Sequence, residues 1–232
     1  MKGPRVHYAT KEFDNLYGGR RRGFIIGGGP SITKLQDSGF DFSKLEGEIT
    51  IGVNKAYNLL TPTYLFFGDA WFWNHFKDEI VNVNCTKFCP DNVARKGKVD
   101  CVKYPDIYVV KRDSGQGCHI RVVPESFGTL VSFWNNSGVS ALRIAHILGL
   151  KPLYLVGFDM YMQDEKGKTH FHDDYSGHRV AATSIVRYEQ FYQAFEATIK
   201  ALRERLVRVY SCSPVSKLND LIPFRDLREV VK

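Results

Sequence analysis

The sequence predicts an α/β fold in which a mainly parallel sheet carries helices on both faces, with an irregular insert around residues 82–134. Three observations predict it. Short apolar runs end in glycine or polar residues, amphipathic stretches lie between these runs, and the two kinds of segment alternate along the chain. Strands that alternate with helices pair in parallel. In such sheets ligands bind beyond the carboxyl ends of the strands, so we expect the functional residues there.

The elements follow in order from the hydrophobic pattern. The apolar runs predict strands at 23–27, 49–53, 63–67, 152–156 and 207–210. Apolar positions at helical spacing predict helices at 70–80, 139–148 and 182–205. Pro30 and Ser31 suit the start of another helix, and a short helix is expected within 213–221. Residues 82–134 hold strand-like runs at 100–104 and 107–111, and residues 162–180 form a polar loop.

The chain has 232 residues, of which 44% are hydrophobic, enough for one domain. We divide it into a basic arm at 1–22 and a single domain at 23–232. No run reaches the roughly 20 apolar residues of a membrane span, and the arm lacks the apolar core of a secretory signal. We therefore expect a cytoplasmic protein with free cysteines, because the cysteine spacings fit no zinc ribbon or finger. The sequence is compatible with a homo-oligomer as well as with a monomer.

The formal net charge of +7 favours anionic partners such as a nucleotide, a nucleic acid or a phosphorylated acceptor. A basic surface without such a partner would have the same composition. Charge alone therefore does not choose between these interpretations.

The turn Gly27-Gly28-Gly29-Pro30-Ser31 follows the first predicted strand. Glycine lets backbone amides approach an anion closely, and the start of a helix adds partial positive charge. The turn has neither the Gly-x-Gly-x-x-Gly pattern nor a Walker loop. We interpret Gly27, Gly28, Gly29 and Ser31 as a phosphate-binding loop, with a purely structural turn as the alternative.

Two asparagine positions extend this site. Asn54 directly follows the second strand, where its amide can bond a ribose hydroxyl or a base edge. Asn136, Ser137 and Gly138 open an amphipathic helix and make a second helix start suited to an anion. Each position is equally compatible with an ordinary cap or turn.

Polar residues gather between 169 and 178, where three histidines and two aspartates occur. Histidine is the usual base near neutral pH, and histidine with aspartate can also hold Mg²⁺ or Mn²⁺. Asp159 follows a strand end and is a candidate for contact with a cation or a substrate hydroxyl, or for a turn cap. The candidate metal ligands are Asp69, His170, His172 and Asp173. A solvated loop is the alternative.

The order of these motifs resembles one superfamily. It runs Gly-x-Gly-Pro-Ser, Val-Asn, Asn-Ser-Gly, Leu-Gly-x-x-x-x-Tyr-Leu-x-Gly-x-Asp-x-Tyr, a histidine loop and Tyr-Ser-Cys-Ser-Pro-x-Ser. The pattern is similar to the Campylobacter-type bacterial sialyltransferases and the related MptE-like group, which includes phage proteins. The resemblance spans about residues 23–222, without residues 82–134. The 170–173 run looks most like the phage members, which would place the protein in host cytoplasm.

The resemblance implies a Rossmann-like fold with a nucleotide donor held by Gly28, Gly29, Asn54, Ser137 and Gly138. It also implies that His178 is the catalytic base and that Tyr161 assists departure of the phosphate. Sialyltransferases have asparagine where this chain has Gly28, so a CMP-sialic acid donor does not follow. The loop after Asp159 is also shorter, so the acceptor site must differ.

The leading hypothesis is therefore a glycosyltransferase that moves a sugar from a nucleotide-sugar donor to an acceptor hydroxyl. Its acceptor would be a surface glycan or modified phage DNA. A second hypothesis is an MptE-type pyrophosphokinase that uses ATP and Mg²⁺. A third is a non-catalytic module that binds nucleotides or nucleic acid.

Overall fold

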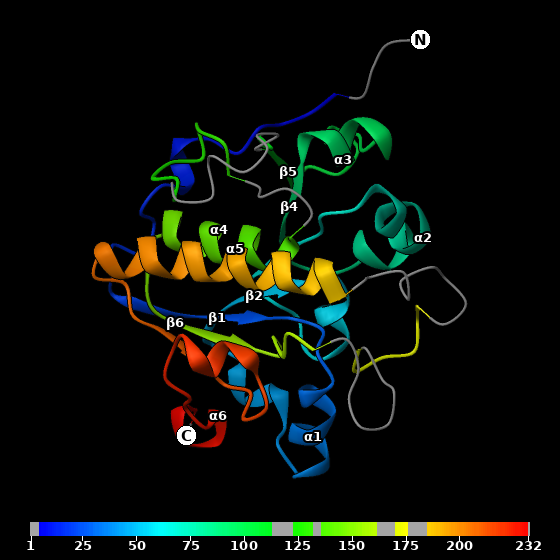
Figure 1. Cartoon of the computed structure of the whole chain (residues 1–232). Helices are drawn as coiled ribbons and strands as arrows, with labels where there is room; N and C mark the ends of the chain where they lie inside the picture. The colour runs from blue at the N-terminus through cyan, green and yellow to red at the C-terminus, as the bar shows by residue number, and fades with distance from the viewer. Residues whose placement is uncertain (1–4, 113–122, 132–135, 162–169, 176–184, 232) are drawn as a thin grey trace.

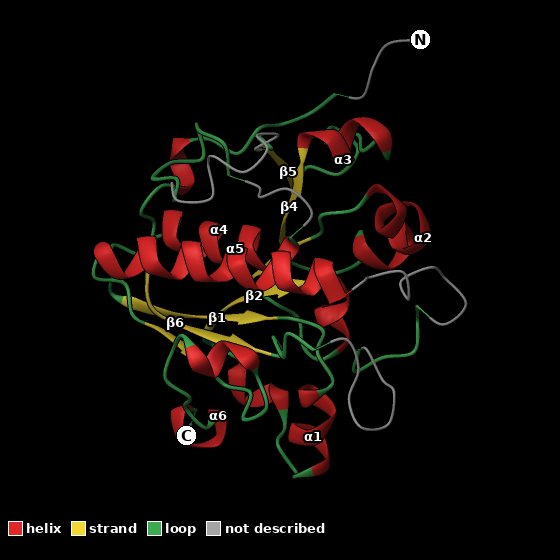
Figure 2. Ribbon diagram, viewed as in Figure 1, coloured by secondary structure: helices red, strands yellow, loops and turns green. Residues whose placement is uncertain are grey.

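A seven-stranded sheet in which every strand is parallel to its neighbours forms the centre of the protein (Figure 2). The structure is a computed structural model that describes residues 5–112, 123–131, 136–161, 170–175 and 185–231. The strand order is β5-β4-β3-β2-β1-β6-β7. The strands are β1 (Arg21–Ile26), β2 (Ile49–Val53), β3 (Tyr64–Phe66), β4 (Thr86–Pro90), β5 (Ile107–Val110), β6 (Leu150–Val156) and β7 (Val209–Ser211).

Helices cover both faces of this sheet, so the predicted fold class is confirmed as α/β and Rossmann-like. In Figure 1, α4 and α5 lie together on one face, and α1 and α6 lie on the other. The helices are α1 (Ser31–Asp37), α2 (Ala70–Ile80), α3 (Asp91–Lys96), α4 (Ser137–Ile147), α5 (Ile185–Glu204) and α6 (Leu227–Val230). Short 3₁₀ helices include η1 (Lys11–Phe13), η2 (Phe42–Leu45), η3 (Asn54–Asn58) and η5 (Lys217–Asp220).

Successive side chains along a strand point to opposite faces of the sheet and pack in different hydrophobic clusters. Ile25 of β1 packs in the cluster under α4 and α5, whereas Phe24 and Ile26 pack in the cluster that includes α1 and α6. Both clusters are buried, because each face of a parallel sheet is covered by helices. The strand is therefore apolar on both faces instead of alternating with polar residues.

Residues 82–134, for which short strands packed against the main sheet or inserted into it are expected, contribute β4 and β5 to that sheet. The expected run at 107–111 is β5, but residues 100–104 contain turns instead of a strand. The cysteines described, Cys85, Cys89, Cys101 and Cys212, are free thiols. Cys118 lies outside the described residues.

The described part of the predicted basic arm packs against the sheet. The His7 carbonyl accepts from the Val109 amide at 2.6 Å, and the Ala9 amide donates to the Val109 carbonyl at 2.9 Å. These bonds place residues 7–9 beside the edge strand β5. Among the described helices, none is long and apolar enough to cross a membrane.

Candidate nucleotide-binding site

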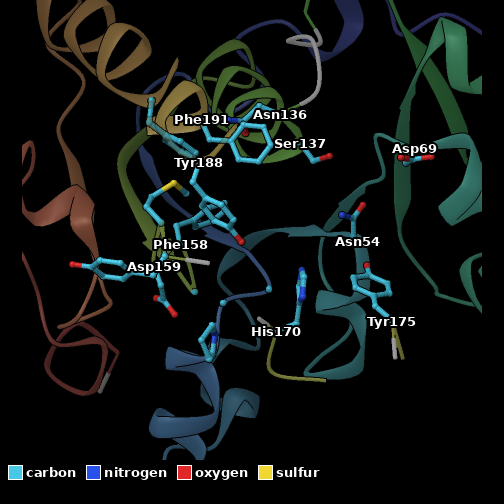
Figure 3. A pocket seen from close by; sticks show the side chains of 18 of the residues that line it. Asn54, Asp69, Asn136, Ser137, Phe158, Asp159, His170, Tyr175, Tyr188 and Phe191 are labelled. Atoms are coloured by element: carbon cyan, nitrogen blue, oxygen red, sulfur yellow. The ribbon is translucent and has the colours of Figure 1, made fainter. Parts of the chain in front are cut away.

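A cavity of about 340 Å³ opens at the carboxyl ends of the central strands, between the turn after β1, the start of α4 and the residues after β6 (Figure 3). This volume suits a small-molecule ligand. The sequence-predicted residues that line it are Gly28, Gly29, Asn54, Asp69, Asn136, Ser137, Gly138, Asp159, Tyr161 and His170. Gly27, Ser31, His172 and Asp173 do not line it. His178 lies outside the described residues.

The glycine turn after β1 differs from the phosphate cradle that the sequence predicts. The Gly27 amide donates to the Val156 carbonyl and the Gly29 amide to the Gly157 carbonyl, both at 2.8 Å. The Ser31 amide donates to the Asp159 carboxylate at 2.8 Å. These three amides therefore attach the turn to the end of β6. Gly28 and Gly29 line the cavity, and because they have no side chains they leave space there for a ligand.

Asp159 is a largely buried residue of the cavity lining whose carboxylate anchors the start of α1. Its side chain accepts from the Ser31 amide, the Ser31 hydroxyl and, at 2.7 Å, the Ser213 hydroxyl. Only 4% of the residue is exposed. A side chain at Gly29 would place its Cβ atom 2.6 Å from the Asp159 carboxylate, so glycine is required for this approach. The carboxylate thus occupies the start of α1, where the sequence predicts an external anion.

The start of α4 remains beside the cavity. Asn136 caps this helix through a 3.0 Å bond from the Val139 amide to its side-chain oxygen. Its side-chain nitrogen has no hydrogen-bond partner within the described structure, although only 7% of the residue is exposed. Ser137 and Gly138, in the first turn, line the cavity. The positive end of the α4 dipole therefore borders the space available to a ligand.

Asn54 faces the same cavity from the end of β2. Its backbone has φ of 52°, in the left-handed region that asparagine adopts more readily than most residues. Its side-chain oxygen is buried and lacks a hydrogen-bond partner in the part of the chain that the structure describes. A buried polar atom without a partner is unfavourable, and a bound ligand can supply the missing hydrogen bond.

Aromatic residues that the sequence does not mark as functional form much of the remaining wall. Trp71 and Phe72 come from α2, Tyr175 from the histidine loop, and Tyr188 and Phe191 from α5. Figure 3 shows Tyr175 and Tyr188 on opposite sides of the pocket. The sequence does indicate that Trp71 and Phe72 lie near the site, because they directly follow Asp69 at the carboxyl end of a strand.

The metal candidates do not assemble into one centre. Among the described residues, no group of three or more histidine, cysteine, aspartate or glutamate side chains could hold a metal ion. Asp69 caps α2 through a 2.7 Å bond from the Trp71 amide. His172 lies 3.7 Å from the Asp174 carboxylate. The structure therefore offers no support for a metal centre made of Asp69, His170, His172 and Asp173.

The buried histidine of this site predicts a pH-dependent stability. Burial, and secondarily the charge of His172, lowers the pKa of His170 from 6.5 to about 4. Below pH 6.5 the unfolded chain takes up a proton that the folded chain does not, so the free energy of unfolding falls as the pH falls. Between pH 7 and pH 5 this group contributes a loss of about 2 kcal/mol. Urea unfolding at both pH values should show a loss that is about 2 kcal/mol smaller in His170→Gln than in the unmodified chain. An equal loss in both proteins would contradict it.

Comparisons with known proteins agree with this architecture. The sequence matches no protein-family model and none of the curated proteins with which it was compared. The sialyltransferase CstII from Campylobacter jejuni, in complex with the substrate analogue CMP-3FNeuAc, is 19% identical with a TM-score of 0.54. The alignment covers 88% of this chain and 86% of CstII.

A second similar structure is the MAf glycosyltransferase from Magnetospirillum magneticum AMB-1. It is 15% identical with a TM-score of 0.57, and the alignment covers 91% of this chain but 34% of that protein. A structure of CstII in complex with cytidine-5'-monophosphate (CMP) is 17% identical with a TM-score of 0.51, covering 88% of this chain and 84% of CstII. At these identities the likeness concerns the fold, and this chain has the fold that occurs in both glycosyltransferases.

Proposed function

We propose that this protein is a glycosyltransferase that takes its sugar from a nucleotide-activated donor bound in the cavity at the carboxyl ends of the strands. The main support is the combination of Asn54 and Asn136, each of which places a buried, unpartnered amide atom at a cavity of ligand size. Ribose hydroxyls, phosphate oxygens and base edges match such amide groups. The structures of similar fold include a sialyltransferase with CMP bound, which agrees with a nucleotide donor.

The donor phosphate is best accommodated beside the start of α4. Ser137 and Gly138 lie there in the first turn, where the helix dipole stabilises negative charge. The start of α1 is a poorer site, because the Asp159 carboxylate already occupies it. The aromatic wall offers flat surfaces for a base or a sugar ring.

The proposed reaction is transfer of the glycosyl group to an acceptor hydroxyl. The acceptor oxygen forms a bond to the anomeric carbon, the bond from that carbon to the phosphate oxygen breaks, and the nucleotide leaves with the electron pair. His178 is the proposed base that receives the hydroxyl proton. Tyr161, which lines the cavity and is 52% exposed, is the proposed hydrogen-bond donor to the departing phosphate.

A ligand screen tests this function. Thermal unfolding should be recorded with CMP, UDP, GDP, ADP and ATP, and with CMP-sialic acid and UDP-N-acetylglucosamine, each with and without Mg²⁺ or Mn²⁺. We expect one nucleotide and its sugar conjugate to stabilise the fold, by about 2.7 kcal/mol at 100 times the dissociation constant. The stabilising conjugate should then release its nucleotide when glycans or DNA are supplied as acceptors.

Paired variants connect the screen to the cavity. Asn54→Gly suits the left-handed backbone and removes only the side chain, so it should reduce the nucleotide shift. Asn82→Ala, at an exposed position outside the cavity, should leave the shift unchanged. Stabilisation by ATP alone, strictly with Mg²⁺, would favour a pyrophosphokinase instead. Nucleotide binding without any turnover would favour a non-catalytic module.

A further inference from the structure

The segment 170–175 crosses the glycine turn and is attached to it at one end. The Phe171 amide donates to the Gly28 carbonyl at 3.0 Å. The Phe171 ring packs, partly buried, against the hydrophobic cluster under α1. These contacts place the neighbouring His170 next to Gly28. If Gly28 carried a Cβ atom, that atom would lie 3.1 Å from the His170 ring.

The other end of the segment is attached through the buried Lys55. Its ammonium nitrogen lies 3.1 Å from the Asp174 carboxylate and 2.6 Å from the Glu79 carboxylate of α2. Only 3% of Lys55 is exposed, and the nitrogen lies 4.0 Å from the centre of the Phe76 ring. Asn58 adds a 3.2 Å hydrogen bond to Asp174. Lys55 thus links α2 and η3 to the segment.

The two attachments hold polar aromatic groups in the cavity. His170 and Tyr175 both line it, and their rings meet edge to face with centroids 4.9 Å apart. Figure 3 shows His170 between the side that carries Asn54 and Tyr175 and the side that carries Asp159. His170 and Tyr175 are therefore part of the cavity wall, whereas Asp173 and Asp174 between them are exposed.

We propose that His170 contacts the nucleotide donor directly and that Lys55 is a positioning residue, which holds the 170–175 segment against the cavity. This inference rests on the function proposed above and adds a recognition element to the same site. At neutral pH the His170 ring is uncharged, because burial lowers its pKa to about 4. A neutral imidazole can donate a hydrogen bond from one nitrogen or accept one at the other, and either suits a hydroxyl group of the donor.

Lys55 acts through the segment, because its ammonium is already paired with two carboxylates. Without that positive charge, Glu79 and Asp174 would face each other as like charges and repel. Lys55→Met, which keeps much of the side-chain volume, should therefore release the segment. Lys55→Arg keeps the charge and should retain the attachment. Glu79→Gln removes the partner on α2 but keeps the Lys55–Asp174 pair, so it is the matched control.

Two measurements test the two parts of this inference separately, namely the attachment of the segment by Lys55 and the contact of His170 with the donor. Hydrogen exchange of the backbone amides in 170–175 should accelerate in Lys55→Met and in Asp174→Asn, but not in Lys55→Arg or Glu79→Gln. The dissociation constant should be measured for whichever of CMP, UDP, GDP or ADP stabilises the unmodified chain most. It should rise about tenfold in His170→Ala and in Lys55→Met, and stay within about twofold in Glu79→Gln.

The outcomes distinguish this inference from the proposed function. If the unmodified chain binds a nucleotide and His170→Ala binds it equally well, the role of His170 is refuted while the function stands. Unchanged exchange in both Lys55→Met and Asp174→Asn would refute the positioning role. If no nucleotide binds the unmodified chain, the proposed function and the donor contact both fail. The exchange measurement then still decides whether Lys55 holds the segment. Asp174→Asn covers the case in which Lys55→Met does not fold.

Discussion

Replacement of Asp159 by alanine should lower the free energy of unfolding by about 4 kcal/mol. The carboxylate accepts three hydrogen bonds, from the Ser31 amide and hydroxyl and from the Ser213 hydroxyl. Ser31 and Ser213 are both buried, so their donors would lose a charged acceptor in a largely desolvated place. Each stranded buried donor costs about 1–3 kcal/mol. Urea unfolding measured at pH 7 should show the loss as a lower midpoint with an unchanged slope.

Asp69→Ala provides a control at an aspartate that also begins a helix. Asp69 is exposed and caps α2 through a single bond from the Trp71 amide, so its loss should be about 1 kcal/mol. Equal losses at the two sites would show that the buried anchor contributes no more than a surface cap. If Asp159→Ala does not fold, Ser213→Ala removes one bond and should lower the stability by about 1 kcal/mol.

Replacement of His178 by alanine should lower the rate of glycosyl transfer by about 10²–10⁴-fold, which is the usual contribution of a positioned base. His178 is proposed to take the proton of the acceptor hydroxyl, so its loss should affect the chemical step and not donor binding. The rate should be measured as release of the nucleotide from the donor that the ligand screen identifies. The thermal shift caused by that donor should remain.

His7→Ala is the matched control. His7 is exposed beside the edge strand β5, whereas the residues that line the cavity follow β1, β2, β3 and β6 or lie in helices or at their starts. This variant should leave the rate unchanged. A His178→Ala protein with full activity would exclude His178 as the base. Loss of both rate and donor binding would assign His178 to binding instead.

The elements with a strong hydrophobic period were predictable from the sequence. The helix expected at 70–80 is α2 with the same bounds, and the strand expected at 49–53 is β2. Both have local signals, since Asp69 caps α2 and β2 is a short run rich in β-branched residues. Signals of this kind depend only on residues that are neighbours along the chain, so they can be recognised without knowledge of tertiary contacts.

β4 escaped prediction because its sequence, Thr86–Pro90, contains a lysine and a proline, which are uncommon in a buried strand. The Lys87 side chain is fully buried, yet its ammonium donates to the carbonyls of Val83 and Cys85 and pairs with Asp106. Asp106 precedes the next strand. Its pairing with Lys87 is a tertiary contact that no periodicity reveals.

The site was predictable in location but only partly in chemistry. The sequence indicates that polar loops meet at the carboxyl edge, and Gly28, Asn54 and Ser137 do line one cavity. It does not indicate that Asp159 occupies the start of α1, because that contact joins residues 128 positions apart. Tyr188 fits a core pattern equally well, and only the position of α5 shows that it lines the cavity.

The position of β1 in the sheet has a consequence for assembly of the chain on the ribosome. β1 lies between β2 and β6, so the strand made first needs a partner made much later. At about 5–20 residues per second, Leu150–Val156 follows Ile26 by roughly ten seconds. During that interval one side of an apolar strand has no hydrogen-bonded neighbour, and such an edge invites pairing with other chains. Nascent chains that stop before β6 should therefore be the aggregation-prone species, and chains extended through both β6 and β7 should not.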